Sequence, residues 1–314
     1  MMHALTAPLL RHSVHTRSWH RFLEHRPAAI SALVLFVLIL LAICQPLLVA
    51  AMGQDPDAVD LLARFEPSTW THPLGTDELG RDVFLRLIAG GRVSLFVGVV
   101  AALIGTLVGT LVGMCAGYYG GRVDSILMRA TDAIIALPLL PVLIVVAAID
   151  PAKLGIPEAW RGGDGADLTR IVVIIALFGW TTVARLVRGA ALALREQEFV
   201  RAATALGATP LRIMRVHLLP NMASPIIVAT TLSVGHVILF ESVLSFLGLG
   251  IQPPRASWGN MLTGAQELIW SAPLLVVYPG MLIFVTVMAF NFLGDGLQHA
   301  LDPRATQRGE RRTA

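Results

Sequence analysis

Two ionisable side chains interrupt a long apolar run, residues 223–247. His236 and Glu241 lie five residues apart within it. A carboxylate inside a membrane-spanning helix is costly, so such a residue is a candidate for a transport pathway or a gate. A lone acid without a partner acid or base makes a poor proton relay. A structural carboxylate, bonded to Ser242, Ser245 or the backbone of another subunit, is therefore the favoured alternative for Glu241.

Recognisable catalytic motifs are absent from the chain. Its one lysine, Lys153, lies outside any G-x-x-x-x-G-K-[ST] phosphate loop, and no H-E-x-x-H, C-x-x-C or G-x-S-x-G pattern occurs. Cys44 and Cys115 lie inside apolar runs and are predicted to be packed free thiols. The sequence therefore predicts no enzyme activity, no metal site built from cysteine and no cofactor bound by this chain.

The net charge and the histidine distribution limit the classes of partner that the sequence indicates. The formal net charge of +3 over 314 residues is small and does not indicate a nucleic-acid partner. Five histidines gather near the N-terminus, at His3, His12, His15, His20 and His25. A metal site is one interpretation of this cluster, and a solvated basic tail beside lipid headgroups is the favoured one.

A polar, arginine-bearing stretch, residues 201–221, separates two apolar runs. Gly207 can adopt the left-handed conformation that ends a helix. Thr209 offers an N-cap hydroxyl, and Pro210 suits the first helical position, where its missing N–H costs nothing. About two turns of helix are then expected before Pro220 stops it. Such a short, ordered protrusion on a membrane protein is typical of a surface that binds a partner protein. It therefore favours a transporter that is powered by a partner subunit.

The composition is that of a polytopic membrane protein. Hydrophobic residues make up 55% of the chain and charged residues 14%, with a mean hydropathy of +0.70, whereas a soluble domain carries about 25% charged residues. Apolar windows of about 20 residues predict membrane-spanning helices. The sequence thus predicts an all-α fold with six transmembrane helices, at residues 28–52, 93–117, 133–149, 168–184, 223–247 and 268–293. Pro138 and Pro141 are expected to bend the third.

The distribution of arginines predicts the orientation. Most basic residues lie in the tails 1–27 and 294–314 and in the loops after the second and fourth spans, whereas loop 53–92 is acid-rich. The positive-inside rule then places both termini and loop 185–222 in the cytoplasm and loop 53–92 in the periplasm. Residues 93–293 are predicted to form a five-helix transmembrane domain that includes loop 185–222.

Small residues recur along one face of the second predicted span. Gly105, Gly109, Gly113 and Gly117 follow one another at four-residue spacing. Such a stripe lets two helix backbones approach closely in lipid. Packing against another span of the same chain and contact with a second subunit are equally compatible with it.

Residues 201–221 resemble the cytoplasmic loop of the type I permeases of binding-protein-dependent ABC importers. The pattern of that family is Glu-Ala-Ala, three residues, Gly, nine residues and Ile-x-Leu-Pro. The chain keeps the pattern at Ala202, Ala203, Gly207, Leu219 and Pro220. It departs from the pattern at Arg201 and His217, which replace the Glu and the Ile. Both departures resemble the peptide-transporting branch of the family.

Three longer stretches point to the same branch. Residues 72–94 resemble its signature before the second span, residues 241–259 its signature after the fifth span, and residues 291–304 its C-terminal signature. Together they extend over most of residues 72–304. The chain is therefore similar to the C-type permease subunits of dipeptide and oligopeptide importers.

The resemblance implies partners and a place in the cell. It implies a bacterial inner-membrane subunit that pairs with a homologous second permease, with two cytoplasmic P-loop ATPases that bind ATP and Mg²⁺, and with a periplasmic peptide-binding protein. It also implies a coupling helix over residues 209–216. The implied ATPase-coupling residues are Ala202, Ala203, Gly207, Thr209, Pro210, Arg212, Arg215, Leu219 and Pro220. Glutathione, an opine or a nickel complex remains an alternative solute, and an ion-coupled secondary transporter is a minor alternative.

Overall fold

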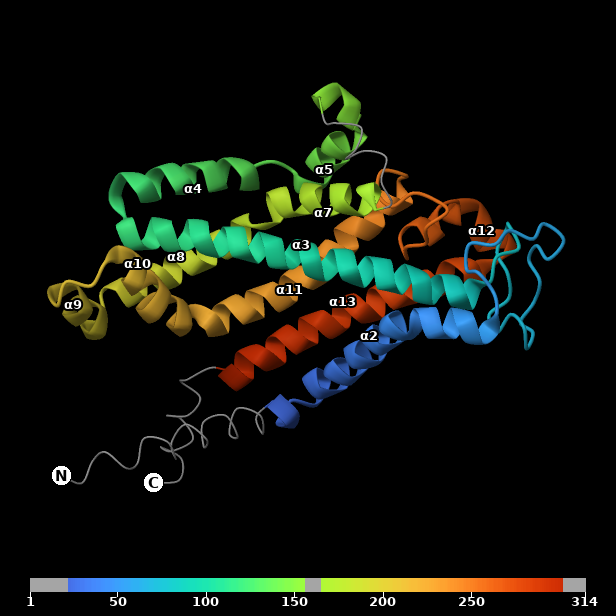
Figure 1. Ribbon diagram of the computed structural model, residues 1–314, viewed down its shortest axis with the longest axis horizontal. Helices are drawn as coiled ribbons and strands as arrows, with labels where there is room; N and C mark the ends of the chain where they lie inside the picture. The colour runs from blue at the N-terminus through green and yellow to red at the C-terminus, as the bar shows by residue number, and fades with distance from the viewer. Residues whose placement is uncertain (1–21, 156–164, 302–314) are drawn as a thin grey trace.

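The computed structural model of the protein describes residues 22–155 and 165–301. Within these ranges the chain is built from helices, without a named β-strand, and most of the long helices run along one axis to form an elongated bundle (Figure 1). In chain order the elements are α2 (Arg26–Met52), α3 (Val83–Tyr119), α4 (Gly121–Ile135), α5 (Leu139–Ala148), η1 (Pro151–Leu154), α7 (Ala166–Gly179), α8 (Thr181–Arg195), α9 (Glu198–Ala205), α10 (Pro210–Arg212), η2 (Ile213–Leu218), α11 (Leu219–Phe246), η3 (Asn260–Leu262), α12 (Ala265–Ser271) and α13 (Pro273–Leu301).

The bundle has two different ends. One end, called here the α9 end, carries α9, α10, the start of α2 and the last turns of α13 (Figure 1). The opposite end, called the α12 end, carries α12 and the loop over residues 53–82 (Figure 1). The grouping of the start of α2 with the end of α13 and α9 agrees with the prediction that these segments share one side of a membrane. Which side of the membrane each end faces stays a prediction.

Helix boundaries follow local capping chemistry. The ring nitrogen Nδ1 of His25 accepts a hydrogen bond from the amide of Ala28 at the start of α2, and Gly53 ends that helix with φ +66°. Asp82 caps α3, because its Oδ1 accepts the amide of Leu85 at 2.7 Å. This cap starts α3 ten residues earlier than the predicted span at residue 93, so the loop predicted over 53–92 is helical from Val83 onward.

Four described helices are long and apolar enough to cross a membrane, and the number rises to six if each of two bent helix pairs is one span. The first bent pair, α4 and α5, turns by 82°, and the second, α7 and α8, by 41°. Pro138 explains the sharper break, because it lacks the N–H that would bond to the turn before it. The predicted third span, residues 133–149, holds the last residues of α4 and all of α5, so the predicted bend at Pro138 is present and is sharp, whereas Pro141 lies inside α5. The predicted sixth span likewise has a break, between α12 and α13, and α13 extends to Leu301 into the predicted C-terminal tail.

The glycine stripe of α3 packs against α8 of the same chain. A methyl group added to Gly109 would lie 2.5 Å from the carbonyl oxygen of Trp180, and one added to Gly117 would lie 2.6 Å from Cβ of Ala191. Gly113 is closed off in the same way by the backbone of Ala184. The structure therefore decides between the two interpretations of the stripe in favour of packing within the chain, with the two helix backbones in close approach.

Candidate functional site

The loop between α8 and α11 begins with a short amphipathic helix, α9, which ends at Gly207. The amide of Gly207 bonds to the carbonyl of Thr204, and the amide of Ala208 bonds to the carbonyl of Ala203, both at 3.0 Å. This pair of bonds is the Schellman arrangement, which needs a left-handed residue at the turn. Gly207 has φ +81°, so the prediction that it ends a helix is confirmed.

The segment after Gly207 differs from the prediction. Thr209 occupies the N-cap position and Pro210 the first turn, but the Thr209 side chain forms no capping bond. The helix also does not stop at Pro220, because residues from Pro210 to Phe246 form one continuous helix of 37 residues. The prediction of a separate short helix over residues 209–216 is therefore wrong. The isolated short helix of this loop is α9, on the other side of Gly207.

A π-helical segment, η2, explains how the helix passes Pro220. A proline inside an α-helix removes one backbone hydrogen bond and crowds the preceding turn. The wider turns of η2 lie directly before Pro220 and give the ring room. Next to this proline, the carbonyl of His217 accepts a hydrogen bond from the side-chain amide Nδ2 of Asn221 at 2.6 Å.

The implied coupling residues lie mostly on the outer surface of this loop, while three buried residues between them anchor it. The exposed members are Ala202, Gly207, Thr209, Pro210, Arg212, Arg215, Leu219 and Pro220, and Ala203 is half-buried. Ile213, Met214 and Leu218 point inward instead and pack with residues of α3 and α8, including Met114 and Val187. The outward side chains are thus held on a packed support.

Exposed apolar side chains add to this surface, and sequence reasoning missed them. Leu206 is 88% exposed, and Leu211 and Val216 are more than half exposed. Apolar groups gathered on an exposed polar loop are a sign of a partner-binding surface. The signal was visible in the sequence as leucines beside Gly207 and Pro210, but only the structure shows that these side chains point away from the bundle.

Ion pairs hold the start of the loop. Arg201 donates from Nη2 to Glu196 at 2.8 Å, and Arg195 donates from Nε to the same carboxylate at 3.3 Å. These hydrogen bonds, that from Arg201 first, hold the pKa of Glu196 below its usual range. Arg195 also donates to the carbonyl of Tyr118 at 3.2 Å, which ties the end of α8 to the end of α3.

A cavity of about 800 Å³ is lined by α5, α7, α8, α11 and α13. Its wall is mostly apolar, with Leu143, Phe178 and Phe240 among the lining residues. Polar groups from α11 break this apolar surface, and they are Asn221, Ser224, Ser233 and His236. An apolar cavity with a few converging polar groups is the usual form of a small-molecule site.

The structure separates the two candidate pathway residues. His236 is exposed and lines the cavity, as a pathway residue would. Glu241 is 0% exposed and does not line it. Five residues along a helix correspond to about 140° of rotation, so the two side chains lie on different faces of α11. A pathway role stays a prediction for His236, whereas Glu241 has the buried, serine-bonded environment of the structural alternative.

Glu241 lies at the centre of a buried hydrogen-bond cluster, called here the Glu241 cluster. Ser94 of α3 donates to Oε2 at 2.9 Å, and Ser245 of α11 donates to Oε1 at 2.8 Å. Each serine hydroxyl also accepts a backbone amide, that of Trp258 at 3.2 Å and that of Ile251 at 3.0 Å, respectively. The cluster therefore joins α3, α11 and the loop that follows α11.

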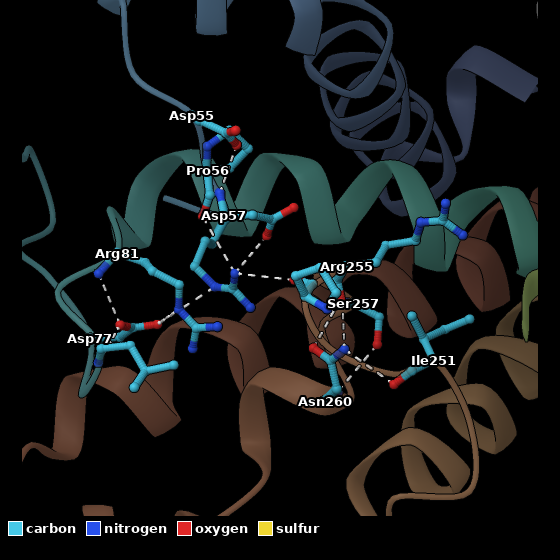
Figure 2. Close-up of polar contacts among 12 residues, drawn as sticks. Asp55, Pro56, Asp57, Asp77, Arg81, Ile251, Arg255, Ser257 and Asn260 are labelled. Carbon is cyan, nitrogen blue, oxygen red and sulfur yellow. Dashed lines mark hydrogen bonds and ion pairs between the residues drawn. The ribbon is translucent and has the colours of Figure 1, made fainter. Parts of the chain in front are cut away.

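A second charged cluster, called here the Arg86 cluster, lies at the α12 end. The Arg86 side chain is 4% exposed. Its Nη1 donates hydrogen bonds to Asp57 at 2.8 Å and to the carbonyl of Pro254 at 3.5 Å. Its Nε lies 3.6 Å from a carboxylate oxygen of Asp77. Arg81 completes it with a 2.7 Å bond to Asp77 (Figure 2). The cluster links loop 53–82 with the loop after α11.

Asp57 is a partly buried acidic member of the Arg86 cluster. Burial raises the pKa of the Asp57 carboxyl above its usual value, even though Arg86 acts in the opposite direction. Beside the cluster, Asn260 holds the loop after α11 in shape, since its side-chain amide donates to the carbonyls of Arg255 at 2.7 Å and Ile251 at 3.2 Å (Figure 2). The α12 end is thus closed by its own polar contacts.

The described residues were predicted to hold no metal site built from cysteine, and the positions of their His, Cys, Asp and Glu side chains bear on this prediction. In residues 22–155 and 165–301, no group of three or more His, Cys, Asp or Glu side chains is placed to hold a metal ion. His3, His12, His15 and His20 lie outside these ranges, so the metal interpretation of the N-terminal histidines concerns residues that the structure does not describe. His25 stacks on His299 with ring centroids 5.3 Å apart.

Comparison with known proteins gives the family. Residues 109–307 match the family described as binding-protein-dependent transport system inner membrane component. The chain belongs to this family. Residues 15–67 also match the N-terminal transmembrane domain of oligopeptide transport permease C. The chain is therefore a multi-pass, inner-membrane component of a transport system, and its family consists of transport proteins.

Named relatives cover nearly the whole chain. The dipeptide transport system permease protein DppC of Bacillus subtilis is 42% identical over 91% of this chain and 85% of its own length. The oligopeptide transport system permease protein OppC of the same organism is 36% identical over 90% of this chain and 88% of its own length. The glutathione transport system permease protein GsiD of Pectobacterium atrosepticum is 38% identical over 95% of both chains.

One solved structure supports the fold. A chain of the MetNI methionine ABC transporter, in inward-facing conformations, superposes with a TM-score of 0.54 at 19% identity, over 69% of this chain and 96% of that chain. At this identity the likeness shows the fold alone. The predicted all-α type I permease fold is confirmed, with four to six spans among the described residues.

Proposed function

We propose that this chain is a transmembrane permease subunit of an ABC importer for di- and oligopeptides in a bacterial inner membrane. A homologous second permease completes the pathway, two cytoplasmic P-loop ATPases bind ATP and Mg²⁺ and drive it, and a periplasmic binding protein delivers the peptide. Dipeptide and oligopeptide permeases among the relatives, at 42% and 36% identity, support the substrate class.

One structural observation carries the proposal. The continuous helix from Pro210 to Phe246 starts in the exposed loop and then lines the cavity through Ser224, Ser233 and His236. A partner that binds the loop would therefore move one wall of the cavity directly. Rigid-body movement of a helix by a bound partner is an established way to convert a distant event into a change at a site.

The orientation follows from the arginines. The α9 end would face the cytoplasm and the ATPases, because the basic loop 185–222 lies there. The α12 end, with loop 53–82 and α12, would then face the periplasm and the binding protein. The apolar side chains of Leu206 and Leu211 would lie against the ATPase surface, with α9 and the first turn of the long helix forming the docking element.

Another solute is the main alternative, because a glutathione permease matches over 95% of this chain. An ion-coupled transporter is less well supported. Such a protein places partnered acids beside its pathway, and Glu241 lies away from the cavity. We propose peptide uptake over these alternatives because two of the named relatives carry peptide substrates in their names.

Affinity purification of the tagged chain from native membranes, followed by mass spectrometry, tests the assembly. We expect a homologous permease and one or two P-loop ATPases at comparable abundance. Proteoliposomes of that complex, supplied with the binding protein and ATP, should then take up di- or oligopeptides in preference to glutathione. A chain that purifies alone and transports in response to an ion gradient would refute the importer assignment, and preferential glutathione uptake would refute the peptide assignment.

A further inference from the structure

The long helix that starts in the exposed loop ends at the Glu241 cluster. Its 37 residues correspond to roughly 55 Å of α-helix. Pro210 lies at the α9 end, whereas Glu241 lies in the last two turns before Phe246. A single helix therefore connects the proposed docking surface to the opposite end of the bundle.

At its far end the helix is bonded to two other segments through one carboxylate. One oxygen of Glu241 accepts Ser94 of α3, and the other accepts Ser245, whose hydroxyl in turn holds the amide of Ile251. Both carboxyl oxygens of Glu241 therefore accept a hydrogen bond. Loss of the Ser94 contact would loosen α3, and loss of the Ser245 contact would loosen the loop after α11.

The segments held by Glu241 form one unit at the α12 end. Trp258 is 1% exposed and donates from Nε1 to the carbonyl of Leu87 at 2.9 Å, which fixes the loop after α11 to α3. A methyl group on Gly91 would lie 2.8 Å from Cζ2 of Trp258, so loop and helix are in close contact. Arg86 extends this unit to loop 53–82 through Asp57. We call the unit of the first turns of α3 (residues 83–94), the loop after α11 and loop 53–82 the external cap.

We propose that Glu241 is a positioning residue that locks the end of the long helix to the external cap. Movement of the cap, when a binding protein seats on it, then reaches the α9 end through one rigid helix, and movement at the α9 end reaches the cap. The inference rests on the proposed function. It assigns to Glu241 a role in signal transmission between the two ends, without contact with the transported peptide.

Hydrolysis of ATP by the assembled importer in proteoliposomes tests the proposal, measured with and without peptide-loaded binding protein. Glu241→Gln keeps the size of the side chain but replaces one acceptor oxygen with a donor, so one serine loses its acceptor. We expect the stimulation by binding protein to fall by roughly tenfold while basal hydrolysis per complex stays unchanged. Ser94→Ala and Ser245→Ala each remove one contact and should each reduce the stimulation by roughly threefold.

Thr286→Val is the matched control. Thr286 is also fully buried, and its hydroxyl has no hydrogen-bond partner among the described residues, so its loss should leave stimulation unchanged. Equal stimulation in the wild type and in the Glu241 and serine variants would overturn the proposal, as would a parallel loss of basal and stimulated hydrolysis. Failure of all three variants to assemble would assign the cluster to folding and also overturn it. A wild-type complex that binding protein does not stimulate would refute the proposed function itself.

Discussion

The two ends of this molecule use the same kinds of residue in opposite ways. At the α9 end, Arg201 is 68% exposed in its ion pair and Leu206 is 88% exposed. At the α12 end, Arg86 is 4% exposed and Trp258 is 1% exposed, and both bond to other segments of the same chain, Arg86 to two loops and Trp258 to α3. The α9 end thus presents its charged and apolar groups to a partner, whereas the α12 end uses them to hold its own loops together.

Because of this difference, substitutions at the two ends should affect different properties, the stability of the subunit at the α12 end and assembly with partners at the α9 end. Removing a buried group takes contacts away from the folded chain itself, so the stability of the subunit should fall. Removing an exposed group leaves the folded chain nearly unchanged, so the effect should appear in assembly.

The largest expected effect is on stability, from Trp258→Ala. The substitution leaves a cavity against Gly91 and removes the bond to Leu87, so we expect a loss of about 3–5 kcal/mol. Thermal unfolding of the purified complex measures it. Trp270→Ala is the control, because Trp270 on α12 is 89% exposed and its removal should shift the unfolding temperature little. Equal shifts for the two variants would contradict the described packing of the loop after α11.

The next effect is that of Arg86→Gln, which leaves the half-buried Asp57 without its ion-pair partner. Breaking a fully buried pair by removing one member costs about 3–5 kcal/mol. We expect a smaller loss of about 2 kcal/mol, because the Asp57 side chain is 36% exposed and Asp77 keeps its bond to Arg81. Chemical unfolding followed by tryptophan fluorescence measures it. Arg92→Gln, two turns further along α3 at an exposed position, should cost less than about 1 kcal/mol. A larger cost at Arg92 would mean that the Arg86 cluster does not close the α12 end.

Gly207→Trp tests the α9 end. Gly207 has φ +81° with open space around it, so the substitution strains the backbone by about 1–2 kcal/mol and places a bulky group on the proposed docking surface. We expect normal membrane insertion but reduced co-purification of the ATPases. Gly264→Trp is the matched control at the α12 end, with φ +76° and open space as well, and should retain the ATPases. Normal co-purification with Gly207→Trp would count against the docking role of this loop.

The smallest effect is a difference in pH dependence between the ends. Burial raises the pKa of Asp57, so its stabilising contribution is present below the unfolded pKa and declines as pH rises through the folded one. Hydrogen bonds lower the pKa of Glu196, so its contribution is present above the unfolded pKa and declines as pH falls. From about pH 4 to about pH 7, the unfolding temperature of the wild type relative to Asp57→Asn should therefore fall, and that relative to Glu196→Gln should rise. If both differences in unfolding temperature changed in the same direction with pH, the opposite pKa shifts of Asp57 and Glu196 would be contradicted.

Local chemistry explains which parts of the site were predictable. Gly207 ends α9 because the left-handed turn needs a residue without Cβ, and this requirement is visible in the sequence. The continuation of the helix through Pro220 could not be predicted from the sequence, because it depends on η2. The buried residues of η2, Ile213 and Leu218, pack against α8. The exposed side of the loop, including Leu206, likewise depends on which face of each helix the bundle covers.

The sequence by itself determined the membrane-spanning character, the transport family and the position of the loop, because apolar length, basic residues and spaced motifs are properties of the chain alone. Only the tertiary structure decided three further points. It gave the glycine stripe its partner, α8, since that choice depends on which helix comes within 2.3–2.6 Å of a methyl group added to Gly109, Gly113 or Gly117. It separated His236 from Glu241 by the rotation of one helix. It also joined Glu241 to Ser94, a contact between residues 147 positions apart that no local pattern encodes.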